Sequence, residues 1–227
     1  MIEIRNLEFS WNQTELVLSV DRLSCAESEK ILIQGPSGSG KSTLLSLLAG
    51  IIRPNSGSIS INNTSLTHLN SKKLDAFRAE NIGYIFQRFN LLPYLTIEEN
   101  IALGCLFSNE RMNRAKSEGR TMEDRIAELL KSFGLEHLQL TDLDTGKLSV
   151  GQQQRVAAAR AMIGSPPLIL ADEPVSSLDS VNKKNFMDRL ISQINLDKSA
   201  LIMVSHDEGL ASFFDRVIPI DQFKYKL

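Results

Sequence analysis

The stretch Gly35-Pro36-Ser37-Gly38-Ser39-Gly40-Lys41-Ser42-Thr43 decides how this chain is interpreted. It follows the apolar run 31–33 and leads into the apolar run 44–49, which predicts a buried strand that turns into a helix. Its glycines let the backbone wrap around an anion, and the helix start adds a positive dipole end. We expect a nucleoside triphosphate here, with Lys41 at its β- and γ-phosphates and Ser42 on Mg²⁺. The alternative is a flexible glycine–serine turn, which would not need to lie between a buried strand and a helix.

The bulk composition is that of an ordinary globular protein. The chain has 227 residues, of which 42% are hydrophobic and 23% charged. A net charge of −2 lacks the basic excess of nonspecific nucleic-acid binding, so no nucleic-acid partner is expected. Cys25 and Cys105 lie far apart without metal-ligand spacing and are interpreted as reduced thiols. Neither a signal peptide nor a membrane-long apolar run is visible, so we expect any membrane role to come through a partner.

The hydrophobic pattern predicts a β-rich first third. Residues 2–11 and 16–23 alternate apolar and polar side chains, and a short strand is expected at 58–61. This indicates an antiparallel layer beside the phosphate-binding strand. In the last third, 167–171 and 200–204 are expected as buried strands, 181–194 as an amphipathic helix and 216–220 as an edge strand.

The middle of the chain changes to a helical pattern. Thr96 and Glu99 form the signature of a capping box at a helix start, and apolar residues recur at helical spacing over 125–133. The polar stretch 108–124 is interpreted as a loop or an exposed helix turn. We predict a single domain over 1–227: an α/β core with a mixed sheet flanked by helices, an antiparallel β subdomain, and an α-helical subdomain inserted at about 88–160.

A second chemical element ends the strand at 168–171. Asp172 and Glu173 follow it directly, where strand ends of open α/β sheets line a ligand crevice. Asp172 can hold Mg²⁺, and Glu173 can deprotonate a water that attacks the γ-phosphate. The alternative, an acidic turn after a strand, does not account for the phosphate-type loop at 35–43.

Further motifs identify a family resemblance. They are the segment Leu148-Ser149-Val150-Gly151-Gln152-Gln153-Gln154-Arg155, Gln87 after Tyr84-Ile85-Phe86, the segment Ser176-Ser177-Leu178-Asp179, and His206 after a buried strand. In this order they resemble the signature motif, Q-loop, D-loop and switch histidine of ATP-binding-cassette (ABC) ATPases, over nearly the whole chain. The resemblance implies a P-loop NTPase of the ABC type that hydrolyses ATP with Mg²⁺.

The resemblance also implies roles for individual residues. Lys41, Glu173 and His206 are expected to be catalytic, with His206 hydrogen-bonding the γ-phosphate. Mg²⁺ is expected on Ser42, Asp172 and Gln87. In a head-to-tail homodimer, the remaining contacts to ATP are expected from Ser149, Gly151, Gln152 and Asp179. The family most often has glycine where Val150 stands, so the backbone there is expected to be helical or extended.

Two expectations concern rings and partners. Trp11 stands where the family stacks an aromatic ring on adenine, with core packing as the alternative. The apolar stretch Gln87–Leu95 stands where a membrane permease docks in ABC transporters, with packing inside the helical subdomain as the alternative.

The segment from Leu74 to Pro93 is similar to the branch that serves lipoprotein release and macrolide efflux. The resemblance implies an export-type transporter subunit at the cytoplasmic face of the bacterial inner membrane. A cell-division-type regulatory ATPase that signals through a membrane partner is the alternative. A soluble cassette acting on DNA or ribosomes fits less well, because such proteins usually carry a coiled coil or two fused cassettes.

Overall fold

The computed structural model describes residues 1–12, 16–138 and 145–223 of the chain. The strands in these ranges form two sheets. The antiparallel sheet has the order β2-β1-β4-β5, with β1 Ile2–Ser10, β2 Leu16–Cys25, β4 Ser56–Ile61 and β5 Thr64–Ser65. The parallel sheet has the order β6-β7-β8-β3-β9, with β3 Lys30–Gln34, β6 Ile82–Ile85, β7 Leu168–Asp172, β8 Ala200–Ser205 and β9 Arg216–Pro219. The predicted α/β core with an antiparallel layer is confirmed, and β9 is the expected edge strand.

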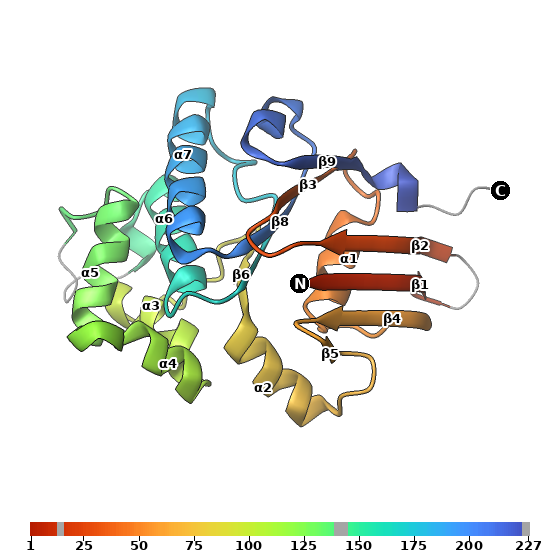
Figure 1. Ribbon diagram of the computed structural model, residues 1–227. Coiled ribbons are helices and arrows are strands. Elements are labelled where there is room, and N and C mark those ends of the chain that lie inside the picture. Colours follow the sequence, from red (N-terminus) through yellow and green to blue (C-terminus); the bar gives the residue numbers. More distant parts are fainter. Residues whose placement is uncertain (13–15, 139–144, 224–227) are drawn as a thin grey trace.

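Most helices lie between β6 and β7 in the chain. The helices are α1 Lys41–Leu48, α2 Ser71–Asn81, α3 Ile97–Leu106, α4 Asn109–Ala115, α5 Met122–Ser132, α6 Val150–Met162 and α7 Ser180–Asp197. Short 3₁₀ turns cover Ser117–Gly119, Thr145–Lys147, Glu208–Phe213 and Ile220–Phe223. Figure 1 shows α3, α4 and α5 at one end of the molecule and the antiparallel sheet at the other. The bounds 88 and 160 of an inserted helical subdomain stay a prediction. In the structure, α6 continues past residue 160 to Met162 and packs on β6.

The predicted capping box at the start of α3 is confirmed. The Glu99 N–H donates to Thr96 Oγ1 at 3.1 Å, and the Thr96 N–H donates to Glu99 Oε2 at 2.8 Å. These bonds satisfy two backbone donors that a helix start would otherwise leave unpaired. The helix therefore begins where the sequence places it, directly after the segment 87–95.

Both faces of the parallel sheet are buried, which explains its continuously apolar strands. Ile31 and Ile33 of β3 face a cluster that contains α1 and the antiparallel sheet, whereas Leu32 faces a cluster built on α3, α6 and α7. Because successive side chains of a strand point to opposite faces of the sheet, the apolar residues of β3 belong to two separate core clusters. Between these layers the carboxyl ends of the strands are held at a fixed edge of the sheet.

Of the two alternatives for 108–124, a loop or an exposed helix turn, the loop is wrong and the helix is only partly exposed. The chain forms α4 there, and Arg111 is buried with only 3% of its surface exposed. Its guanidinium donates to the carbonyls of Ala79, Ile82, Ala161 and Ile163 at the ends of α2 and α6. Burial lowers the pKa of Arg111 to about 10. The polar pattern of the segment does not reveal that its arginine binds carbonyls at two helix ends.

We predict that Arg111→Met destabilises the protein by about 3 kcal/mol, because buried carbonyls lose their donors and the loss of a hydrogen bond to a charged group costs up to that amount. Urea unfolding followed by circular dichroism measures this. Arg53→Ala is the control: Arg53 donates to the Thr67 and Leu69 carbonyls at the surface, and its loss should cost about 1 kcal/mol or less. Equal losses in the two variants would contradict a capping role for Arg111.

Candidate nucleotide site

The loop at 35–43 joins β3 to α1 in the predicted way. The Gly35 N–H donates to the Ser205 carbonyl at 3.2 Å, which ties the loop start to the end of β8. Gly38 and Gly40 have φ values of 77° and 97°, a left-handed backbone that side chains with a Cβ rarely adopt. Ser39 Oγ donates to the Pro36 carbonyl at 2.7 Å and so closes the loop internally. The loop is a preformed cradle open to an anion.

Lys41 occupies the middle of this cradle. Its side chain is buried, and Nζ donates to the carbonyls of Gly35 at 2.7 Å and of Pro36 at 2.9 Å. Nζ also lies 3.3 Å from Glu173 Oε1. A buried ammonium with these partners is poised to exchange carbonyl contacts for phosphate oxygens.

Ser42 and Asp172 meet at the edge of the sheet. Ser42 Oγ donates to Asp172 Oδ1 at 2.9 Å. Burial raises the pKa of the Asp172 carboxyl, while the bond from Ser42 works against that rise. A hydroxyl and a carboxylate side by side are hard oxygen ligands of the kind that Mg²⁺ prefers, so these residues fit the ion.

Glu173 and His206 lie against each other. Glu173 is buried, and its Oε2 lies 2.9 Å from His206 Nδ1, with Ser205 Oγ donating to the same oxygen at 3.4 Å. The Glu173 backbone has a φ of 46°, and its N–H donates to the Val204 carbonyl at 3.1 Å. A strained backbone held in this way fixes the direction of a side chain. The structure thus brings Lys41, Glu173 and His206 together.

A cavity of about 490 Å³ lies against Lys41, Ser42 and Glu173. It is lined by Trp11, Val17, Ser37, Gly38, Gly40, Lys41, Ser42, Thr43, Gln87 and Glu173. Trp11 is 65% exposed, so core packing is excluded for it, while its neighbour Phe9 is buried and meets it edge to face. Val17 and Ser205 were missed by the sequence analysis, because no motif marks either of them.

Two groups of predicted residues are not part of the cavity lining. The first group borders the cavity through bonds or chain neighbours: Gly35, Pro36, Ser39, Asp172 and His206. Among the residues that the structure describes, the second group is Ser149, Gly151, Gln152 and Asp179. Ser149 is the N-cap of α6 in a capping box with Gln152, and Asp179 accepts from the Val181 and Asn182 N–H groups as the N-cap of α7. Val150 begins α6 and is helical, as expected. Within one copy, these residues lie apart from the cavity, with Ser149, Val150 and Asp179 exposed and Gly151 and Gln152 half-buried.

Comparisons with known proteins agree with this geometry. The profile of a family described as "ABC transporter" matches residues 18–176. The uncharacterized ABC transporter ATP-binding protein YvcR of Bacillus subtilis is 42% identical over 92% of this chain and 77% of its own length. The lipoprotein-releasing system ATP-binding protein LolD of Bacteroides fragilis is 35% identical over 96% of both chains. A solved dimeric structure of the cassette MJ0796 bound to ADP and Pi has a TM-score of 0.82 at 36% identity, covering 96% of this chain and 94% of that one.

The fold and the site define an ATP-binding cassette. The chain belongs to the ABC transporter family, as its ATPase component that binds and hydrolyses ATP. Its resemblance to the branch that contains LolD is confirmed. No helix in the described part of the chain has the length and apolarity needed to cross a membrane.

We predict that Lys41→Ala weakens ATP binding by about 10- to 100-fold, because the phosphates lose a charged hydrogen-bond donor. Titration with a fluorescent ATP analogue measures the dissociation constant. Lys72→Ala, on the exposed surface of α2, is the control and should bind as the unchanged protein does. An unaltered affinity in Lys41→Ala would refute the placement of the phosphates at this loop.

Proposed function

We propose that this protein is the ATPase subunit of a bacterial export-type ABC transporter, working as a homodimer around two ATP molecules on a membrane partner. The observation that supports the proposal is that the residues expected to bind ATP form two separate groups within one copy of the chain. The phosphate loop and Glu173 line one cavity, while the signature surface of Ser149, Gly151 and Gln152 lies outside it and is at least partly exposed. The likeness to LolD, whose name describes lipoprotein release, supports the export branch.

The residues at and beside the cavity have different expected roles in ATP hydrolysis. Glu173 Oε1 faces Lys41, and Oε2 faces His206, which orients the carboxylate for taking a proton from an attacking water. Bound Mg²⁺ would neutralise phosphate charge, held by Ser42 and Asp172, with Gln87 at the same cavity. No cluster of three or more metal-ligating His, Cys, Asp or Glu side chains occurs among the described residues, which suits Mg²⁺ because it keeps waters and phosphate oxygens as ligands.

The exposed signature surface requires a second copy. The start of α6 presents a positive dipole end, and Gly151 leaves room there, its nearest neighbour for an added Cβ being Leu178 at 3.9 Å. Such an end suits the γ-phosphate of an ATP bound to the partner's loop. The cassette MJ0796, similar over 96% of this chain, is described as dimeric.

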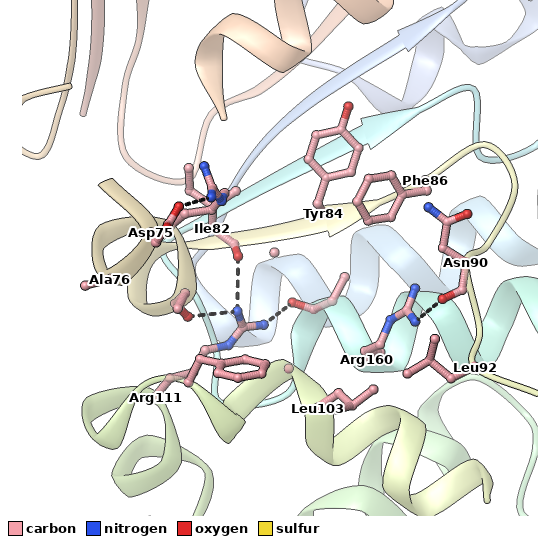
Figure 2. A pocket seen from close by; sticks show the side chains of 16 residues that line it. Asp75, Ala76, Ile82, Tyr84, Phe86, Asn90, Leu92, Leu103, Arg111 and Arg160 are labelled. Atoms are coloured by element: carbon pink, nitrogen blue, oxygen red, sulfur yellow. Dashed lines mark hydrogen bonds and ion pairs between the residues drawn. The ribbon is translucent and has the colours of Figure 1, made fainter. Parts of the chain in front are cut away.

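The surface proposed for the membrane partner is an apolar groove of about 810 Å³ (Figure 2). It includes Phe86, Asn90 and Leu92 from the segment Gln87–Leu95 and its flank, together with Tyr84, Leu103 and Phe107. Phe107 is 76% exposed at its rim. An open groove with an exposed aromatic rim fits a short amphipathic helix of a permease, and its occupant would touch the segment that carries Gln87.

We predict that Glu173→Gln slows hydrolysis by roughly 10²- to 10⁴-fold, the usual contribution of a positioned base, and lets an ATP-bound dimer accumulate. Phosphate release gives the rate, and sedimentation velocity with Mg-ATP gives the oligomeric state. Glu208→Gln, an exposed residue just beyond His206, is the matched control and should remain active and turn over ATP. Hydrolysis at the original rate would remove Glu173 as the base. A persistent monomer would remove the homodimer.

We predict that Phe107→Asp leaves ATP binding intact and abolishes co-purification with the membrane subunit of the transporter, because a charge replaces an apolar contact. Leu196→Asp is the control: Leu196 is 73% exposed on α7 and lies outside the groove, so its variant should still co-purify. Retained co-purification of Phe107→Asp would count against the groove. A partner of the cell-division type would favour the regulatory alternative over export.

A further inference from the structure

One short segment of chain separates the nucleotide cavity from the apolar groove. Gln87 lines the cavity, while Phe86 and Asn90 line the groove. The segment follows directly from the end of β6 at Ile85. Residues 86–90 therefore connect the groove to Gln87 through a short stretch of backbone, and the contacts that hold these residues help to place Gln87.

The backbone just after Gln87 is in an unfavourable conformation. Phe89 and Asn90 have φ values of 44° and 51°, in the left-handed region that asparagine tolerates but a bulky residue such as phenylalanine rarely adopts. Two such residues in a row persist only when surrounding contacts hold them in place. The segment therefore depends on an external tie.

Arg160 of α6 supplies that tie. Nη1 donates to the Asn90 carbonyl at 2.6 Å, and Nη2 donates to the Phe89 carbonyl (Figure 2 shows the bond to Asn90). The planar guanidinium presents its donors as a fork, which fits two neighbouring carbonyls in a way that a lysine ammonium does not. Burial lowers the pKa of Arg160 from its ordinary value, and the arginine still carries its charge at neutral pH.

The tie is anchored on a rigid base. Gly104 of α3 packs so closely on α6 that an added Cβ would lie 2.3 Å from the Arg160 carbonyl. A second tie follows at Leu92, whose N–H donates to Asn100 Oδ1 at 2.8 Å and whose carbonyl accepts from Asn100 Nδ2 at 3.0 Å. Both ties lead to the packed pair α3 and α6, so residues 89–92 move with these helices. Gln87 stands just before the first tie.

We propose that Arg160 is a positioning residue that sets Gln87 in the nucleotide cavity through the carbonyls of Phe89 and Asn90, and so sets the affinity of the ATP-bound site for Mg²⁺. The proposal rests on the proposed role of Gln87 as a ligand of Mg²⁺ or its water. Arg160 itself lines the groove, so a partner bound there would contact the guanidinium that holds Phe89 and Asn90.

The test compares Arg160→Lys with Arg114→Lys in the full chain. Arg114 also forks onto two carbonyls, of Gly164 and Glu80, but contacts none of residues 86–90 in the described bonds. We expect Arg160→Lys to raise the Mg²⁺ concentration for half-maximal ATPase activity about tenfold and lower kcat by about as much, as with other outer-shell partners of metal sites. ATP binding in excess EDTA should stay unchanged. Arg114→Lys should keep the original Mg²⁺ profile.

The variant Gln87→Ala distinguishes the proposed role of Gln87 at Mg²⁺ from the proposed positioning role of Arg160. We expect it to shift the Mg²⁺ profile as Arg160→Lys does, and the double variant to shift it no further, since both changes act on one contact. If Gln87→Ala shifts the profile and Arg160→Lys does not, the positioning role is overturned and the site stands. If Gln87→Ala has no effect, the role of Gln87 fails, and the Arg160 proposal falls with it.

A second variant approaches the same tie from the loop, for the case that Arg160→Lys does not fold. Asn90→Val leaves α6 untouched, and a β-branched residue disfavours the left-handed conformation that the fork requires. We expect the same rise in the Mg²⁺ requirement. An original profile in a folded Asn90→Val protein would overturn the proposal.

Discussion

The hydrogen-bonded register of three parallel strands is the constraint on which the rest of the structure depends. Gln34 of β3 pairs with Ser205 of β8, and Asp172 of β7 pairs with Val204 of β8. Each strand therefore ends at the same edge of the sheet, where the next residues carry the chemistry. A slip of one residue in either pair would turn Asp172 or the start of the phosphate loop to the other face. The apolar packing on both faces of the sheet holds this register.

The site at that edge keeps buried charges close together. Lys41 and Glu173 are both nearly inaccessible and lie 3.3 Å apart, with His206 on the other carboxylate oxygen. Burying such a pair costs desolvation, which the added bonds from the loop carbonyls and Ser205 partly offset. A pair of this kind contributes little to stability on its own. Its value is that the charges stand in fixed positions before a ligand arrives.

Arginines bound to backbone carbonyls hold the helical part of the molecule to its neighbours. Arg111 joins the ends of α2 and α6, Arg114 joins the same region through Glu80 and Gly164, and Arg160 joins α6 to the segment behind Gln87. These contacts are directional, unlike apolar packing, and each crosses between elements that are distant in sequence. Directional bonds of this kind fix the positions of the elements that they join.

Local residue patterns determined much of this protein. Nine residues in a row define the phosphate loop, the acids follow an apolar strand, and Thr96 with Glu99 marks a helix start, because each signal depends on neighbours within a few positions. Only the tertiary structure decided that Arg111 is buried, that Arg160 reaches Phe89 and Asn90, and that Ser149 lies away from the cavity of its own chain. A long polar side chain such as arginine looks the same in a sequence pattern whether it lies in solvent or at a buried helix end. Its partners are backbone carbonyls, which every residue possesses and no sequence pattern marks.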